Sequence, residues 1–234
     1  MRRNSTKKVT SMGYYSEKLS AEKLKKCYNL APERVKQYLE AEINHVLQKI
    51  QPSGIVLELG CGYGRVLPAI ASKAKQVTGI DTSLSSIEYG QRFTNPVRNC
   101  TMVQMDAANL TFNDRTFDLV VCIQNGISAF HVDQREPMKE SLRVTKPGGT
   151  VLFSSYSEKF WSHRLEWFRL QSEAGLLGEI DFKKSGNGII VCKDGFTATT
   201  VSPEQFLNLT SGFNAEVSIV EVDNSSLFCE INTI

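Results

Sequence analysis

Short runs of apolar residues recur along the middle of the chain, and the stretches between them are long enough for crossover helices. Five such runs cover residues 55–59, 76–80, 101–105, 117–123 and 150–154. Continuous apolar strands that alternate with helices are typical of a parallel sheet covered on both faces. We therefore predict an α/β fold with five parallel strands, with helices over residues 65–75 and 137–144 and a turn at residues 146–149.

The pattern differs at the two ends of the chain. Apolar positions have helical spacing over residues 32–50, which begin at Pro32 and are followed by Pro52. Tyr14, Tyr15 and Tyr28 lie upstream in a polar, helix-prone stretch. We therefore predict an N-terminal helical segment over residues 1–50.

Beyond Tyr156 the alternation of strands and helices stops. We predict an amphipathic helix over residues 158–173, a hairpin of residues 189–193 and 197–201, and a helix over residues 203–211. Residues 216–222 and 227–232 form two final strands whose short link makes them antiparallel. The chain is thus predicted to insert residues 157–201 after the fifth strand and to end in an antiparallel pair at the sheet edge.

The composition favours one hydrophobic core. The chain has 234 residues, 41% of them apolar, and a formal net charge of +2. This near balance argues against a strongly electrostatic nucleic-acid binder. The basic residues Arg2, Arg3, Lys7 and Lys8 are interpreted as part of a solvated tail.

Cysteine spacing and hydropathy exclude further classes of protein. None of the six cysteines forms a CxxC pair, so neither a structural metal site nor a redox dithiol is indicated. No secretory signal or stretch long enough to span a bilayer is present. We expect a cytoplasmic protein with no metal and no membrane association.

The sequence VLELGCGYGR, residues 56–65, places a glycine-rich turn directly after the first strand. Dinucleotide-binding folds require G-x-G-x-x-G, but Arg65 stands at the third glycine position. No Walker lysine follows either. What remains is E-x-G-x-G-x-G, formed by Glu58, Gly60, Gly62 and Gly64. The turn therefore suits a ligand that lies close to the backbone and has an amino-acid end.

This pattern resembles motif I of the class I methyltransferases that use S-adenosylmethionine. Further landmarks follow in the family's order across residues 55–156: Asp81 ends the second strand, Asp106 follows the third, and Gln124 and Asn125 follow the fourth. The resemblance implies a Rossmann-like, doubly wound sheet. It also implies an N-terminal lid within residues 1–50 and a methyltransferase domain over residues 51–234.

The resemblance also implies where the cofactor S-adenosylmethionine binds. Asp81 would accept the ribose hydroxyl protons, Asp106 would recognise the adenine amine, and Glu58 would lie beneath the amino group. Asp81 could instead cap a helix that begins at Ser83, and Asp106 could be an ordinary loop acid. The implied cofactor-binding set is Glu58, Gly60, Cys61, Gly62, Gly64, Asp81, Thr82, Asp106, Ala107 and Gln124.

Catalytic residues are not fixed by any motif, because methyl transfer from a sulfonium mainly needs alignment and a dry pocket. The candidates are His131, Tyr15 and Tyr28, with Tyr14, Tyr156 and His163 as further substrate-side groups. His131 could equally be a surface residue. Trp161 and Trp167 suit an aromatic lid or, alternatively, plain core.

We therefore expect an S-adenosylmethionine-dependent methyltransferase that acts on a small molecule. N-P-P-[YF] is absent after the fourth strand, which disfavours base or glutamine amides as acceptors. The alternatives are an RNA or protein methyltransferase, and a non-catalytic cofactor-binding protein of the same fold. Arg65 disfavours an NAD enzyme. The acceptor atom and the oligomeric state stay open.

Overall fold

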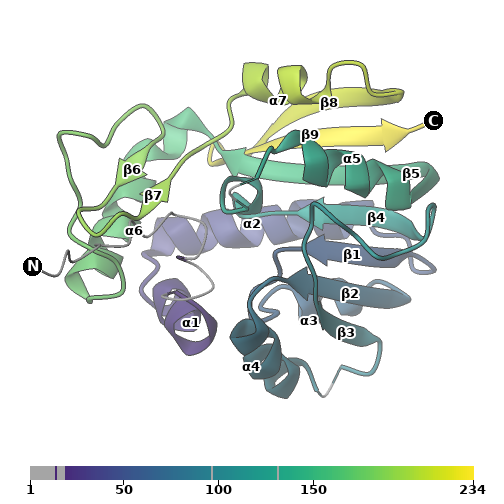
Figure 1. Ribbon diagram of the computed structural model, residues 1–234, viewed down its shortest axis with the longest axis horizontal. Helices are drawn as coiled ribbons and strands as arrows, with labels where there is room; N and C mark the ends of the chain where they lie inside the picture. Colours follow the sequence, from purple (N-terminus) through teal and green to yellow (C-terminus); the bar gives the residue numbers. More distant parts are fainter. Residues whose placement is uncertain (1–13, 15–18, 96, 131) are drawn as a thin grey trace, which may run out of the picture.

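The computed structural model describes residues 14, 19–95, 97–130 and 132–234 (Figure 1). The basic N-terminal residues 2, 3, 7 and 8 and the candidates Tyr15 and His131 lie outside the described residues. The strands of the main sheet are β1 (Ile55–Leu59), β2 (Gln76–Asp81), β3 (Cys100–Gln104), β4 (Phe117–Cys122), β5 (Thr145–Tyr156), β8 (Ala215–Val222) and β9 (Ser226–Thr233).

These strands lie in the order β3-β2-β1-β4-β5-β9-β8. The first five of this order are parallel, whereas β9 pairs antiparallel with both β5 and β8. The expected α/β fold with a mostly parallel sheet is confirmed. The antiparallel strands continue the same sheet, so that it has seven strands in the described part of the chain.

Helices cover both faces of the sheet. The helices are α1 (Ala21–Asn29), α2 (Glu33–Lys49), α3 (Leu67–Ala71), α4 (Leu84–Thr94), α5 (Arg135–Val144), α6 (Trp161–Glu173) and α7 (Pro203–Thr210), with short 3-10 turns at Gly126–Ser128 and Glu158–Phe160. α2, α3 and α4 share one apolar cluster with the sheet, and α5 and α7 share the other. No helix in the described part of the chain is long and apolar enough to cross a membrane.

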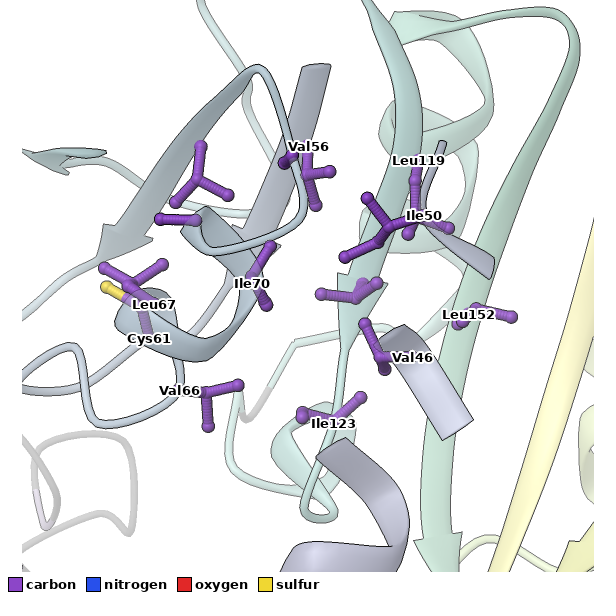
Figure 2. Packing of buried hydrophobic residues seen from close by; sticks show 14 of the residues in the cluster. Val46, Ile50, Val56, Cys61, Val66, Leu67, Ile70, Leu119, Ile123 and Leu152 are labelled. Atoms are coloured by element: carbon purple, nitrogen blue, oxygen red, sulfur yellow. The ribbon is translucent and has the colours of Figure 1, made fainter. Parts of the chain in front are cut away.

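The core beneath α2 and α3 is close-packed (Figure 2). Val46 of α2 and Ile70 of α3 are fully buried beside Val56 of β1 and Leu119 of β4. Apolar strands buried on both faces are what a parallel sheet requires.

Two local predictions differ from the structure. Residues 65–75 were expected to be helical, but α3 has five residues and ends at Ala71, beyond which the Lys73 N–H turns back to the Ile70 carbonyl. The helix begins late because the glycine turn takes up the first part of this crossover, with hydrogen bonds from the Gly64 N–H to the Cys61 carbonyl and from the Leu67 N–H to the Gly64 carbonyl. The turn expected at residues 146–149 belongs instead to β5, whose register with β4 shifts between Phe117 and Leu119. An irregularity of this kind absorbs the extra backbone without ending the strand.

The N-terminal segment and the insertion share their own core. Cys27 of α1 packs with Phe168 of α6 and with Phe196. The hairpin strands β6 (Ile190–Val191) and β7 (Thr197–Ala198) have two residues each, fewer than expected. In Figure 1, β9 points toward the C-terminus and the parallel strands run the other way, and α1, α6 and the hairpin lie beyond the carboxyl ends of the parallel strands.

The burial of the core side chains predicts how much their truncation lowers the free energy of unfolding. We expect Ile70→Ala to lower the free energy of unfolding by about 2–5 kcal/mol, because a buried cavity replaces the lost methyl groups. Leu207→Ala, on the exposed side of α7 at 51% exposure, is the matched control and should change it by about 0.5 kcal/mol or less. Urea denaturation measures both, and equal losses would contradict this description of the core.

Candidate functional site

A cavity of about 210 Å³ lies where the parallel strands end. Open α/β sheets bind ligands at this edge. Nine of the ten predicted cofactor-site residues line it: Glu58, Gly60, Cys61, Gly62, Asp81, Thr82, Asp106, Ala107 and Gln124. Tyr28 of α1 also lines the cavity, and Gly64 does not.

The glycine turn brings bare backbone to the cavity wall. Gly60, Gly62 and Gly64 have φ angles of +69°, +54° and +77°, a region that side chains disfavour. A Cβ on Gly60 would come within 2.9 Å of the Phe130 ring. Gly64 has a different role, because a Cβ there would lie 3.1 Å from the Leu67 side chain, which packs behind the turn. Gly64 therefore permits close packing rather than contact with a ligand.

Asp81 braces the glycine turn from the end of β2. One of its carboxylate oxygens accepts a hydrogen bond from the Gly62 N–H at 2.9 Å, and the other accepts one from the Ser83 N–H at 2.8 Å. Burial raises the pKa of Asp81, while these two hydrogen bonds lower it. Helix α4 is capped by Ser83 itself, whose hydroxyl accepts from the Ser86 N–H. Each Asp81 oxygen retains acceptor capacity toward the cavity.

The third strand contributes a more exposed corner of the cavity. Asp106 is solvent-exposed and accepts from the Ala108 N–H at 2.9 Å, so it shapes its own loop. Ala107 beside it is buried. Thr82 is exposed, and its carbonyl accepts from the Gln104 side chain at 3.0 Å.

Glu58 and Arg65 are the charged groups at the inner wall. Glu58 is 4% exposed, and one of its oxygens has no hydrogen-bond partner among the described residues. Burial raises the pKa of Glu58 to about 8, although the nearby Arg65 lowers it. The Arg65 guanidinium lies 4.4 Å from the centre of the Tyr28 ring. Its Nε and Nη2 atoms are buried with no hydrogen-bond partner in the described part of the chain.

Sequence reasoning missed Arg65 as a functional residue. It treated the arginine only as a departure from the dinucleotide motif. The available signal was a cation placed directly after a tight, buried turn that also carries an acid. Pairing a free carboxylate oxygen with free guanidinium donors gives this wall complementary groups for an ammonium and a carboxylate.

The turn after β4 lies beside the glycine turn, because β1 and β4 pair in parallel, and it is tied to α1. The Tyr28 hydroxyl donates to the Gln124 side-chain oxygen at 3.2 Å. The Gln124 side-chain nitrogen is buried without a hydrogen-bond partner among the described residues. Burial raises the pKa of Tyr28, so its phenol stays protonated near neutral pH. Tyr28 can therefore donate a hydrogen bond but is a poor base.

The remaining part of the cavity wall is rich in aromatic side chains and carries no charged side chain among the described residues. It comes from β5, the loop after β4, α6 and β7: Tyr156, Phe130, Asn125, Ser128, Trp167, Phe168, Gln171, Thr197 and Ala198. The Trp167 indole lies 5.9 Å from the Tyr28 ring and donates to the Cys27 carbonyl. Sequence reasoning named Trp167 and Tyr156 but missed Gln171 and Ser128, since neither belongs to a motif.

Other candidates lie away from the cavity. The Tyr14 hydroxyl donates to Asp194 at 2.7 Å, and His163 lies beside the Phe160 ring at 5.5 Å. Neither residue lines the cavity, and neither does Trp161. No group of three or more His, Cys, Asp and Glu side chains in the described ranges could hold a metal ion.

Comparison with known proteins identifies the central part of the chain. Residues 56–149 match the family described as "Methyltransferase domain". The chain is 36% identical over 115 residues to the demethylmenaquinone methyltransferase of Staphylococcus epidermidis, covering 46% of each chain. It is 30% identical over 142 residues to the ubiquinone biosynthesis O-methyltransferase of Coxiella burnetii, covering 60% of this chain and 56% of that protein.

A solved structure extends the likeness of the fold to almost the whole chain. The DhpI–SAH complex aligns with a TM-score of 0.64 at 21% identity and covers 95% of both chains. The chain spans about half the length of the curated relatives it matches. The family match over residues 56–149 includes the glycine turn and the strand-end acids.

Glu58 should make stability depend on pH. Its pKa is raised on folding, so the folded state holds the proton more tightly and stability falls as pH rises from 4.5 through about 8. Relative to Glu58→Gln, the wild type should lose at most about 5 kcal/mol of unfolding free energy between about pH 5 and about pH 9. Urea denaturation at the two pH values measures this difference.

Asp118→Asn is the control for that experiment. Lys146 holds the pKa of Asp118 below its ordinary value, so its contribution is fully present above pH 3.8 and should stay constant over the same range. A wild type that parallels Glu58→Gln at both pH values would contradict the burial of an ionisable Glu58.

Proposed function

Since residues 56–149 form a methyltransferase domain of the class I, Rossmann-like type that uses S-adenosylmethionine, we propose that the whole chain is a methyltransferase for a small-molecule acceptor. The observation that carries the proposal is the wall formed by Glu58 and Arg65. Its free acceptor and free donors lie against a turn of bare glycine backbone.

This wall fits the amino-acid end of the cofactor. The free Glu58 oxygen can accept from the ammonium group, and the Nε and Nη2 atoms of Arg65 can donate to the carboxylate. A bound ammonium would also offset the cost of ionising buried Glu58. Arg65 thus joins the proposed site beside the residues expected from the sequence.

We propose that the remaining cofactor contacts are made at the ends of β2 and β3. Asp81 would accept from the ribose hydroxyls with the acceptor capacity left by its two backbone hydrogen bonds. Asp106 and Ala107 would border the adenine at the end of β3. The backbone would approach the cofactor closely at Gly60, Cys61 and Gly62, whose side chains would contribute no chemistry.

The acceptor would occupy the aromatic part of the cavity. Burying an unpaired charge there is costly, so the uncharged wall favours a neutral, planar molecule. Two of the matched relatives are named for quinone pathways, which is consistent with such an acceptor. A cavity bounded by α1 and the insertion favours a small acceptor over RNA or protein.

In the proposed reaction the chain aligns the reactants and excludes water. Bound S-adenosylmethionine supplies an activated methyl group. Tyr28 and Gln124 can orient an acceptor by hydrogen bonds, and Trp167 and Phe168 of α6 limit access of water. α1 and residues 157–201 would act together as the cap over the site. His131, as a base, and Tyr15 remain catalytic candidates outside the described residues.

Cofactor binding is the first test. Calorimetry should show that the full chain binds S-adenosylhomocysteine and does not bind NAD. Asp81→Ala should weaken binding about 10- to 100-fold, because charge-assisted hydrogen bonds of about 1.5–3 kcal/mol are lost. Asp181→Ala removes a similar carboxylate contact, to the Lys183 N–H at 3.1 Å, away from the cavity and should bind normally.

The outcomes separate the alternatives. Absence of S-adenosylhomocysteine binding would overturn the proposed function. Binding without turnover of any acceptor would favour the non-catalytic cofactor-binding protein. Equal affinities for Asp81→Ala and Asp181→Ala would remove Asp81 from the ribose site.

Acceptor charge gives a second test. Hydroquinone and 2,5-dihydroxybenzoate share a ring and two hydroxyls but differ by one carboxylate. The neutral compound should have a kcat/KM at least about tenfold higher, because the aromatic wall offers no cation to a buried carboxylate. Initial rates of methyl transfer measure this, and a preference for the carboxylate would contradict a neutral acceptor.

A further inference from the structure

A buried carboxylate lies behind the cavity, on the helix that covers the sheet. Glu42 of α2 is 0% exposed. It accepts hydrogen bonds from the Gln124 N–H at 2.5 Å, from the Ser154 hydroxyl at 3.0 Å and from the Ser226 hydroxyl. These donors come from the end of β4, from β5 and from β9. One side chain thus joins α2 to three strands.

The position is unusual for an acid. Apart from the Tyr38 hydroxyl, the other buried side chains of α2 are apolar, and burying a carboxylate costs free energy unless its oxygens are satisfied. No salt bridge to Glu42 occurs in the described part of the chain. Burial raises its pKa to about 7, although the three hydrogen bonds lower it. An apolar residue would fill the space at less cost, so a role beyond packing is indicated.

The residue that Glu42 holds is itself strained. Gln124 and Asn125 are consecutive non-glycine residues with φ angles of +57° and +62°. Such conformations persist where the surroundings enforce them, and they cluster at functional sites. Asn125 is fixed by its own contacts, donating to the Thr199 carbonyl at 2.9 Å and accepting from the Ser155 hydroxyl at 2.8 Å. Gln124 is fixed through its N–H by Glu42 and through its side-chain oxygen by Tyr28.

We propose that Glu42 is a positioning residue that acts through Gln124. By holding the strained Gln124 backbone, it aims the Gln124 side-chain nitrogen into the cavity as a donor to an oxygen of the bound cofactor or acceptor. This inference rests on the proposed function, because it assigns the free Gln124 nitrogen to a ligand of that site. Glu42 lies behind the cavity wall and is not among the residues that line the cavity.

The charge state of Glu42 decides how firmly it holds the turn. The ionised carboxylate accepts all three hydrogen bonds, whereas a proton occupies one of its acceptor positions. The titratable groups that face it are Tyr38 on α2, Tyr156 on β5 and Cys122 on β4. Burial raises the pKa of each of them, so all three stay neutral near pH 7. Glu42 is therefore the group expected to titrate there.

The first arm of the test needs no ligand. In ¹⁵N-labelled full chain, the Gln124 backbone amide resonance should titrate on both sides of pH 7, and Glu42→Gln should abolish this change. Glu230→Gln is the matched control, because Glu230 of β9 is also buried and contacts α2, through His45 at 2.7 Å and Lys49 at 2.6 Å, but does not touch the turn. It should leave the titration intact.

A second variant, Ser154→Ala, tests the same point if Glu42→Gln does not fold. Ser154→Ala removes one hydrogen bond that favours the ionised form, so the midpoint of the Gln124 titration should move to higher pH. A Gln124 amide that does not respond to pH, or that titrates unchanged in Glu42→Gln or Ser154→Ala, would overturn the inference.

The second arm measures ligand contact at about pH 8, where Glu42 is mostly ionised. Glu42→Gln and Gln124→Ala should each weaken either S-adenosylhomocysteine binding or hydroquinone kcat/KM about 3- to 10-fold. The double variant should lose no more than Gln124→Ala alone, because Glu42 acts through that side chain. A structural role would give additive losses, and additivity in both measurements would overturn the inference.

The two arms separate this inference from the proposed function. An effect on S-adenosylhomocysteine assigns the Gln124 nitrogen to the cofactor, and an effect on hydroquinone alone assigns it to the acceptor. A wild type that neither binds nor methylates these probes would refute the proposed function and with it the ligand role of Gln124. The titration would still decide whether Glu42 holds the turn.

Discussion

The hydrogen bond from the Gly62 N–H to the Asp81 carboxylate is the contact on which the site depends. It joins the turn after β1 to the end of β2 and fixes bare backbone at the cavity wall. Parallel neighbouring strands make this contact possible, because their carboxyl ends meet at one edge. Glu58 and Arg65 flank the same turn, so both residues line the cavity and hold their buried, unpartnered polar atoms close to it.

Charge is divided within the cavity. The charged lining residues gather along β1, β2 and β3, while the walls from β5, α6 and β7 are uncharged. This division gives one part of the cavity the means to hold a zwitterionic, ribose-bearing molecule and leaves the other suited to a neutral ring. The insertion and α1 share a common core, so the uncharged wall is built from segments that are distant in sequence.

The sequence predicted the regular part of the fold well because buried parallel strands consist of continuous runs of apolar residues. It failed where tertiary context overrides local preference. Residues 146–149 contain Pro-Gly-Gly and indicate a turn, yet pairing with β4 draws them into β5. Residues 65–75 permit a longer helix, but the hydrogen-bonded glycine turn extends to Leu67 and leaves room only for α3.

For the site, the sequence by itself determined the glycine turn and the acids that follow the strands. These features are local, since backbone freedom and strand ends are set by nearby residues. Only the tertiary structure decided that Arg65 lies over Tyr28, that Tyr28 reaches Gln124, and that Glu42 holds Gln124 from α2. The last contact joins residues 82 positions apart, and it exists because packing α2 on the sheet places a buried carboxylate within reach of a strained turn.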